Sequence, residues 1–325
     1  MSDAPPFRIT PHILNAVGRI CEEIGVMKAG LHSVPPNLRK RNRVKSITGT
    51  LGIEGNTLTE EQVTAVLDGI PVMGSARELA EVQGAIQAYD ALPGLNPYAL
   101  KDLLAAHALM MRGVLSNAGS FRTTGVGIQK GDQVLHIAPP ADRVRGLVNS
   151  LLLWAKSSEI HPLITSSVFH YEFEFIHPFS DGNGRLGRLW QTRLLAEWNP
   201  LFYTLPLESM IRDHQQAYYD ALASADHQAD STEFVSFMLG VIEETLRKNA
   251  SINASINAPL HLEGLKTPDA ILACVQQNPA MTREEMAGRI GKDIRTIARA
   301  IRKLQNAGIL QRVGSAKSGT WQVLR

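Results

Sequence analysis

Apolar residues recur every three or four positions through most of this 325-residue chain. The pattern is clearest at 76–92, 98–115, 144–156 and 164–175, while few windows alternate apolar and polar residues as a half-buried strand would. Because a helix places positions i, i+3 and i+4 on one face, these segments are predicted to be amphipathic helices. The sequence therefore predicts an all-α body.

One short region departs from this helical pattern. Between residues 126 and 140, two β-prone runs flank the sequence KGD and end at a double proline. Glycine and aspartate between two such runs are typical of a tight turn, and proline ends a strand because it lacks the N–H that a ladder needs. A single β-hairpin is predicted here.

A second domain is predicted at the C-terminal end. Residues 249–265 are small, polar and weakly repetitive, which is typical of a linker. Beyond them, residues 266–325 contain 11 basic and 4 acidic side chains, a surplus of +7, and because the whole chain carries +2 the preceding part carries −5. The linker is thus predicted to separate a larger acidic part from a small basic module.

Helix signals divide the basic module into three helices. The first is predicted over 268–278, and Thr282 with Glu285 forms a capping box that opens the second. Gly291 then turns the chain into a third helix over 293–306.

The third helix of the module has two unlike faces. Its predicted buried face consists of Ile294, Ile297, Ile301 and Leu304, and its other face carries Arg295, Arg299 and Arg302. With a two-stranded wing expected over 311–324, the module resembles a winged helix-turn-helix domain, whose third helix lies in the major groove in DNA-binding members. A basic face is equally typical of a solvated helix, so DNA binding is one of two alternatives.

Composition limits the class of protein. The two cysteines, Cys21 and Cys274, stand far apart and in no metal-ligand spacing, so neither a disulfide framework nor a zinc site is predicted. No apolar run reaches the roughly 18 residues that span a bilayer, and the first residues lack a signal-peptide pattern. We expect a cytoplasmic protein without a membrane segment.

The strongest functional signal is HPFSDGNGRLGR, residues 177–188. Proline forces the preceding helix to end, which holds His177 at a helix terminus. Gly182 and Gly184 lead into a new helix, so successive backbone N–H groups can face an anion. This geometry predicts an anion-binding site next to an imidazole.

Charged side chains in the same stretch point to a polyphosphate. Arg185 and Arg188 are three residues apart on one side of the new helix and suit phosphate oxygens. Asp181, at the mouth of the loop, offers one hard oxygen ligand to Mg²⁺, which typically takes one or two carboxylates together with phosphate oxygens and waters. The metal is expected to arrive with the nucleotide.

This stretch is similar to the signature loop of Fic proteins, HPFx(D/E)GNGRxxR, without a departure. The resemblance implies a helical enzyme that transfers AMP from ATP to a Ser, Thr or Tyr hydroxyl of a target protein, or of itself. It implies His177 as the general base and Asp181 as the Mg²⁺ ligand. It also assigns nucleotide binding to Asp181, Gly182, Asn183, Gly184, Arg185, Leu186, Gly187 and Arg188, with Phe179 anchoring the loop in the core.

The resemblance to Fic proteins extends over about residues 31–247. It implies that the hairpin is the family's flap, along which a target segment adds as a strand. The flap positions that close over the nucleotide are Val134, Leu135, His136 and Ile137. Tyr218 and Tyr219 correspond to the tyrosines on the adenine side, although Asp226 stands where the family often has asparagine.

A second motif, TLGIEGN at residues 50–56, resembles the family's inhibitory pattern (S/T)xxxE(G/N). The resemblance implies that Glu54 pairs with Arg188 and occupies the guanidinium that the γ-phosphate of ATP requires. An ordinary helix end at Glu-Gly is the alternative. The domain order that follows is 1–96 as the N-terminal region with the inhibitory motif, 97–248 as the Fic domain, 249–265 as the linker and 266–325 as the winged helix.

Several functional alternatives remain open from the sequence. The protein could remove AMP as well as add it, or transfer another nucleotide, since nearly the same loop serves UMP transfer. The Doc-type kinases are a related branch, but they carry lysine and a different small residue where Gly184 and Arg185 stand. A DNA-binding regulator is the non-enzymatic alternative. A homodimer is one alternative for the oligomeric state, since relatives often form dimers.

Overall fold

The computed structural model describes residues 4–30, 36–125, 127–130, 133–257, 260–313 and 319–324. The chain forms two compact units. One contains Met1–His32 and Arg41–Arg247, and the other contains Ser33–Lys40 and Lys248–Arg325.

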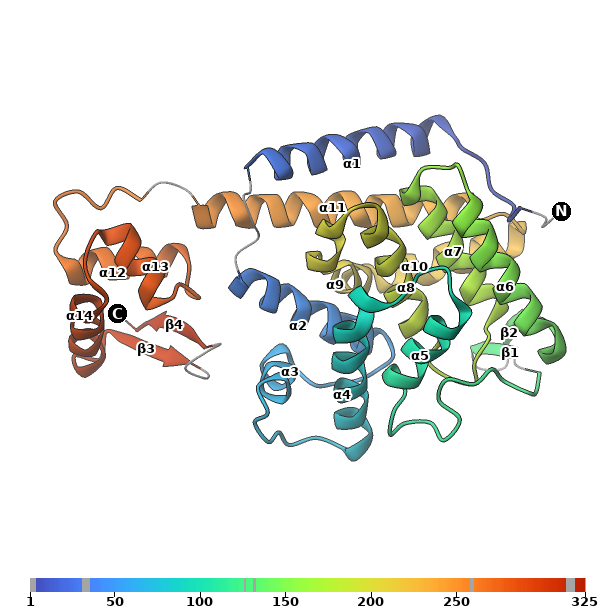
Figure 1. Cartoon of the computed structure of the whole chain (residues 1–325), viewed down its shortest axis with the longest axis horizontal. Helices are drawn as coiled ribbons and strands as arrows, with labels where there is room; N and C mark the ends of the chain where they lie inside the picture. Colours follow the sequence, from blue (N-terminus) through green and yellow to red (C-terminus); the bar gives the residue numbers. More distant parts are fainter. Residues whose placement is uncertain are drawn as a thin grey trace. The chain divides into compact units, whose positions relative to one another are not determined.

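Helices dominate the first unit, as the apolar spacing predicts (Figure 1). In chain order the elements up to the end of α11 are α1 (Pro11–Gly30), α2 (Pro36–Ile53), α3 (Glu60–Leu67), α4 (Ala76–Ala91), η1 (Leu92–Gly94), α5 (Leu100–Met110), β1 (Gly127–Lys130), β2 (Gln133–Ile137), α6 (Ala141–Ser157), α7 (Pro162–Ile176), α8 (Asn183–Trp198), η2 (Pro200–Thr204), α9 (Leu207–Asp213), α10 (Gln215–Gln228) and α11 (Thr232–Asn257). The predicted all-α body is therefore confirmed, as is the hairpin, whose strands pair antiparallel.

Helices α7 and α8 form the centre of this unit and pack against each other. Both are buried along most of their length, with Phe169 and Phe173 of α7 and Trp190 of α8 among the largest fully buried side chains. Because large apolar groups fix both helices, the short loop that joins them, residues 177–182, is held firmly at both ends.

The long helices α1 and α11 run side by side in Figure 1. Arg19 of α1 donates to Glu243 of α11 at 2.9 Å, and Arg247 donates to Glu23 at 3.2 Å. The arginines of both ion pairs are exposed, so the pairs align the two helices but contribute little stability individually. The buried face of α1, which includes Ile13, Ile20 and Ile24, supplies most of the contact energy.

Helix α2 docks through polar as well as apolar contacts. Asn42 Nδ2 donates to the Thr204 carbonyl at 2.8 Å, and Ser46 Oγ donates to Glu208 Oε2 at 2.7 Å. Both side chains are buried, and Thr50 follows one turn later on the same face. The spacing of four residues gives α2 a continuous polar stripe.

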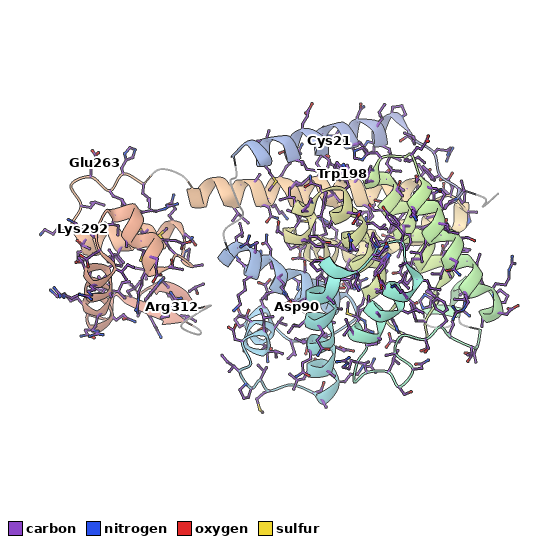
Figure 2. All side chains as sticks on the ribbon, viewed as in Figure 1. Cys21, Asp90, Trp198, Glu263, Lys292 and Arg312 are labelled. Atoms are coloured by element: carbon purple, nitrogen blue, oxygen red, sulfur yellow. The ribbon has the colours of Figure 1, made fainter. Side chains whose placement is uncertain are left out.

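The second unit contains α12 (Thr267–Gln277), α13 (Arg283–Ile290), α14 (Ile294–Asn306), β3 (Leu310–Val313) and β4 (Thr320–Val323). The predicted capping box is present, because Thr282 accepts from the Glu285 N–H while Glu285 accepts from the Thr282 N–H. Strands β3 and β4 pair antiparallel as the wing. In Figure 2, Arg312 lies on this wing, and its guanidinium stands 4.5 Å from the centre of the Trp321 ring.

One residue of α14 departs from the prediction. Ile297, Ile301 and Leu304 are buried as expected, but Ile294 is 47% exposed. Ile294 is the first residue of the helix, so the apolar stripe begins there before the helix reaches the side chains of the module's core. The three arginines of the opposite face, Arg295, Arg299 and Arg302, are exposed.

The segment expected to be a linker is partly helical. Helix α11 continues to Asn257, well past residue 249, because neither glycine nor proline interrupts the chain between 241 and 258. The domain limits given above remain predictions. Within the ranges that the structure describes, no helix combines the length and apolar character needed to cross a bilayer.

Candidate functional site

The loop between α7 and α8 begins with a left-handed turn at His177. Its backbone has φ 47° and ψ 61°, and its N–H still donates to the Phe173 carbonyl at 3.1 Å. Pro178 disfavours helical geometry for the preceding residue, which explains why α7 ends at Ile176. The half-buried imidazole of His177 is thereby fixed at a helix end, as predicted.

Two glycines shape the start of α8. Gly182, the N-cap, has φ 85°, a conformation that L side chains rarely adopt, and a Cβ there would lie 2.5 Å from Met111 Sδ. At Gly184 a Cβ would lie 2.6 Å from Glu54 Oε1 and 3.0 Å from Arg188 Nη1. Only hydrogen at these two positions leaves the helix terminus open to a ligand that approaches the backbone closely.

Asn183 stabilises the loop from within. Its Oδ1 accepts from the Phe179 N–H at 2.8 Å, and its Nδ2 donates to the Phe179 carbonyl at 2.9 Å. The side chain is 2% exposed. Because the side-chain amide is engaged inside the loop, the group that Asn183 offers to an anion is its backbone N–H.

His107 of α5 packs against the same loop and donates a hydrogen bond to it. Its ring stacks on Phe179 with the centroids 3.6 Å apart. Nδ1 accepts from the Gly119 N–H at 2.8 Å, so Nε2 carries the proton and donates to the Asp181 carbonyl at 3.0 Å. Burial lowers the pKa of His107 to about 4, which keeps the ring neutral at pH 7.

Arg185 lies beside Asp181 at the entrance of α8. Its Nη2 donates to Asp181 Oδ1 at 2.8 Å, and Nη1 lies 3.5 Å from Glu81 Oε1 of α4. The residue is 2% exposed, yet its Nε and Nη1 have no hydrogen-bond partner among the described residues. Buried donors without acceptors are costly, so this guanidinium suits an incoming anion.

Arg188, one turn further along α8, is already occupied. Its Nη2 donates to Glu54 Oε1 at 2.6 Å and to the Thr50 carbonyl at 3.1 Å, and its Nε donates to Thr50 Oγ1 at 3.0 Å. Burial is the largest single influence and acts to lower the pKa of Arg188, but the charge and the hydrogen bond of Glu54 together with neighbouring groups more than offset it, so the pKa is raised. The first and fifth positions of the TLGIEGN motif thus bind the same guanidinium.

The turn that carries Glu54 is held from two sides. Gln215 Nε2 of α10 donates to the Ile53 carbonyl at 3.1 Å. On the other side, Asn56 Nδ2 donates to Glu81 Oε2 at 2.9 Å. Glu81 therefore connects the turn to Arg185 as well as to α4.

A buried carboxyl, Glu174, stands next to Arg188. Burial raises the pKa of Glu174 to about 8, the charge of Arg188 opposes this shift, and Glu54 adds to it. Its Oε1 has no hydrogen-bond partner among the described residues and lies 3.8 Å from His170 Nε2. Glu174 is therefore protonated at neutral pH, and its neutral form adds no negative charge to the site.

Among the side chains that the structure describes, those of the remaining predicted site residues do not gather at the start of α8. Leu186 is fully buried in the core, and Gly187 faces Glu174 and His170, so their side-chain positions lie away from the helix terminus. Tyr218 is 1% exposed with its OH 3.1 Å from His170 Nε2, whereas Tyr219 is 43% exposed. The side chains of the flap residues, Val134, Leu135, His136 and Ile137, lie outside the described residues, although β2 itself contains them.

Five residues that contribute to this site are absent from the sequence-based prediction: Glu81, His107, Arg122, Glu174 and Gln215. The side-chain hydrogen bonds of Arg122 reach residues up to 55 positions away, and Gln215 lies 162 positions from Ile53. No local pattern marks such contacts. A polar residue at an otherwise apolar helix position, such as His107 between Ala106 and Ala108, is the one signal that the sequence offers.

Comparisons with known proteins agree with this geometry. The profile of the Fic/DOC family matches residues 97–195, and a winged helix-turn-helix DNA-binding profile matches residues 270–311. A crystal structure of a Fic family protein from Desulfovibrio desulfuricans is 40% identical, has a TM-score of 0.75 and covers 98% of both chains. Fic-1 from C. elegans is 23% identical with a TM-score of 0.61 over 74% of each chain, which supports the fold alone.

The fold and the loop define a helical protein with two buried arginines near the start of α8, and the chain belongs to the Fic family. Among curated relatives, a protein adenylyltransferase Fic from Culex quinquefasciatus is 27% identical over 81% of this chain and 50% of its own length. Another, from Drosophila ananassae, is 30% identical over 67% of this chain and 44% of its own. The chain thus spans about half the length of the curated relatives it matches.

Proposed function

We propose that this protein is an adenylyltransferase that moves AMP from ATP to a hydroxyl group of a protein. One observation carries the proposal: the loop 177–182 brings His177 to the N-terminus of a helix that contains two buried guanidinium groups one turn apart. The N-terminal N–H groups and the arginines together suit a triphosphate. The adenylyltransferases among its relatives favour AMP as the group transferred.

In the proposed reaction, the oxygen of a Ser, Thr or Tyr hydroxyl attacks the α-phosphorus. The bond between that oxygen and phosphorus forms, the bond to the bridging α–β oxygen breaks, and pyrophosphate leaves. His177 takes the proton of the hydroxyl, a contribution of about 10²- to 10⁴-fold. The backbone at 182–184, together with Arg185 and Arg188, would hold the phosphates and position the α-phosphorus for attack.

The residues present fit a Mg²⁺ ion that arrives with the nucleotide. Asp181 is a hard oxygen donor with about a third of its side chain exposed. Within the described parts of the chain, no group of three or more His, Cys, Asp or Glu side chains is gathered to hold a metal without help. Asp181 would therefore share the ion with phosphate oxygens and waters, and the ion would neutralise phosphate charge.

The contact between Glu54 and Arg188 supports autoinhibition. Glu54 occupies the guanidinium that we assign to the γ-phosphate, and it lies against Gly184 at the helix terminus. At about 4 Å and an effective dielectric constant near 20, the gross attraction of such a pair is roughly 4 kcal/mol before desolvation is subtracted. A triphosphate must replace this contact in order to bind productively.

The test uses labelled ATP and the full chain. Glu54→Gly is expected to increase the incorporation of AMP into the protein itself or into a target, and adding His177→Ala to that variant is expected to abolish it. Unchanged incorporation in Glu54→Gly would contradict the inhibitory role. Incorporation that survives His177→Ala would contradict the general-base role.

Nucleotide choice and reversibility need a separate measurement. The mass added to the protein after incubation with mixed nucleotides distinguishes AMP from UMP or a phosphate. Modified protein incubated with Mg²⁺ and no ATP would lose AMP if the enzyme is also a hydrolase with Glu54 aligning a water. Retention of AMP throughout would leave transfer as its one activity. The homodimer and the cytoplasmic location stay predictions.

The second unit supports DNA binding as an additional function. Arg295, Arg299 and Arg302 are exposed on one side of α14, within a segment that carries a surplus of +7 from residue 266 onward. Fluorescence anisotropy with duplex DNA should show an affinity that falls steeply with salt concentration. Arg299→Ala should lower this affinity more than Lys266→Ala does. Equal affinities for both variants would contradict a role for this face.

A further inference from the structure

Arg122 is a buried arginine outside the signature loop. It lies between α5 and β1, and only 3% of its surface is exposed. Its five N–H donors form a planar fork that can reach several acceptors at fixed angles. The described partners of its side chain are all backbone carbonyls.

Two of these carbonyls belong to the end of α7. Nε donates to the His177 carbonyl at 2.7 Å, and Nη2 lies 3.3 Å from the Ile176 carbonyl. The last carbonyls of a helix have no partner within the helix and carry partial negative charge, so a guanidinium there is favourable. The backbone N–H of Arg122 also donates to the Pro178 carbonyl at 3.0 Å.

The other two carbonyls lie on either side of the hairpin. Nη1 donates to the Thr124 carbonyl, at 2.8 Å, just before β1. Nη2 donates to the Pro139 carbonyl, at 2.5 Å, just after β2. One guanidinium therefore joins the chain entering the hairpin, the chain leaving it and the turn at His177.

We infer that Arg122 is a positioning residue, which fixes the distance between the hairpin that presents the acceptor segment and the imidazole that removes the acceptor's proton. The inference rests on the proposed AMP transfer. If a target segment adds along the hairpin, its hydroxyl reaches the α-phosphorus only when hairpin and His177 are in register. The arginines that we assign to the phosphates, Arg185 and Arg188, are not among the side chains that Arg122 contacts.

Lysine at position 122 keeps the charge but replaces the fork by one compact ammonium group, which holds fewer of the four carbonyls at once. In the Glu54→Gly background, Arg122→Lys should lower kcat for self-modification about 10- to 100-fold, while KM for ATP changes less than about twofold. The matched control is Arg193→Lys, since Arg193 is also buried and donates to a backbone carbonyl, that of Leu95, at 2.7 Å. This control should retain the parental kcat.

Amide hydrogen exchange tests the anchoring without any activity. In Arg122→Lys, strands β1 and β2 should exchange faster than in the parent, whereas α7 should be unchanged. An unchanged kcat, unchanged strand exchange, or a rise in KM for ATP that accounts for the whole loss would each overturn the inference. If Arg122→Lys and Arg122→Gln both lose cooperative melting, the residue serves folding and the inference is equally wrong. A Glu54→Gly parent that transfers no AMP would instead contradict the proposed function, while hydrogen exchange would still test the anchor.

Discussion

Arg185 and Arg188 lie one turn apart on α8 and are equally buried, yet their surroundings differ. Arg185 pairs with Asp181, four residues before it in the same loop, and retains donors without hydrogen bonds. Arg188 is bound by Thr50 and Glu54, which lie more than 130 residues earlier in the chain. The first arginine is hydrogen-bonded to the loop just before it. The second is hydrogen-bonded to residues at the end of α2.

This difference shows how the proposed anion site can have both of its arginines in place while one of them is already bound by other residues. Burial makes each guanidinium a strong ligand for phosphate, because a low local dielectric strengthens its charge. The same burial makes it costly to leave Arg188 without a partner, so the contact with Glu54 stabilises the protein, and under the proposed autoinhibition it also keeps Arg188 from a phosphate. Five predictions test the two arginines and their surroundings.

The largest expected effect concerns Glu174, beside Arg188. Its pKa is about 8 in the folded chain and near 4.5 without burial, so the folded state holds one more proton between these values. Glu174 should therefore contribute a fall in stability of about 1.4 kcal/mol per pH unit as pH rises from about 4.5 to about 8, and the difference between the parent and Glu174→Gln should show this slope. Chemical denaturation across that range measures the effect.

The same experiment in Glu54→Gln sharpens the comparison. The charge of Glu54 raises the pKa of Glu174, so without it the pH range over which stability falls should end at a lower pH. An unshifted range would mean that Glu174 does not sense the pair formed by Glu54 and Arg188.

Removal of the Glu54 charge should also open the second arginine to nucleotide. Glu54→Gln keeps the size of the side chain, and we expect it to raise the affinity for a non-hydrolysable ATP analogue about 100-fold, since roughly 4 kcal/mol of gross attraction is partly offset by desolvation. Isothermal titration calorimetry measures this. The control is Glu61→Gln, an exposed glutamate in the first turn of α3, and an equal gain there would break the comparison.

Loss of the first arginine should weaken binding even when the second is free. In the Glu54→Gln background, Arg185→Gln should reduce affinity for the ATP analogue about tenfold, because charge-assisted hydrogen bonds are worth about 1.5–3 kcal/mol. Arg77→Gln is the control, since Arg77 also approaches Asp181, at 3.3 Å, but is 67% exposed. Similar losses in both variants would mean that Asp181, rather than Arg185, is the group affected.

The smallest effect is expected at Thr50. Thr50→Val removes the acceptor of Arg188 Nε and leaves a buried donor unpaired, so basal AMP incorporation should rise about fivefold and stability should fall by about 1–2 kcal/mol. Thr48→Val is matched, because Thr48 Oγ1 is buried on the same helix and has no hydrogen-bond partner in the described ranges. Stability loss without increased incorporation would leave inhibition to Glu54 alone.

Local signals account for the parts of this structure that could be predicted. Pro178 fixes the end of α7, Thr282 with Glu285 opens α13, and apolar spacing gives the helices. The hairpin follows equally from its turn residues and the prolines after it. Each of these outcomes depends on residues only a few positions apart.

Contacts between distant segments could not be predicted, because no local pattern marks residues that only the fold brings together. Within the loop, too, the sequence does not show that the Asn183 amide binds Phe179, four residues earlier, rather than facing outward. Ile294 fits the apolar stripe of α14, but as the first residue of the helix it precedes the buried positions and is 47% exposed. The role of Arg122 depends on three segments that the fold, and not the sequence order, brings together.

The polar stripe of α2 determines how the turn that follows the helix and carries Glu54 can move. Asn42, Ser46, Thr50 and Glu54 follow one another at four-residue intervals, and the first three meet different acceptors or donors on η2, α9 and α8. If the helix moved along its axis by one turn, each partner would face a side chain that does not match it. The hydrogen bonds therefore fix the position of α2 along its axis. Under the proposed autoinhibition, activation with α2 in place therefore requires the short turn at 53–56 to move outward. That movement breaks chiefly its hydrogen bonds to Gln215, Glu81 and Arg188.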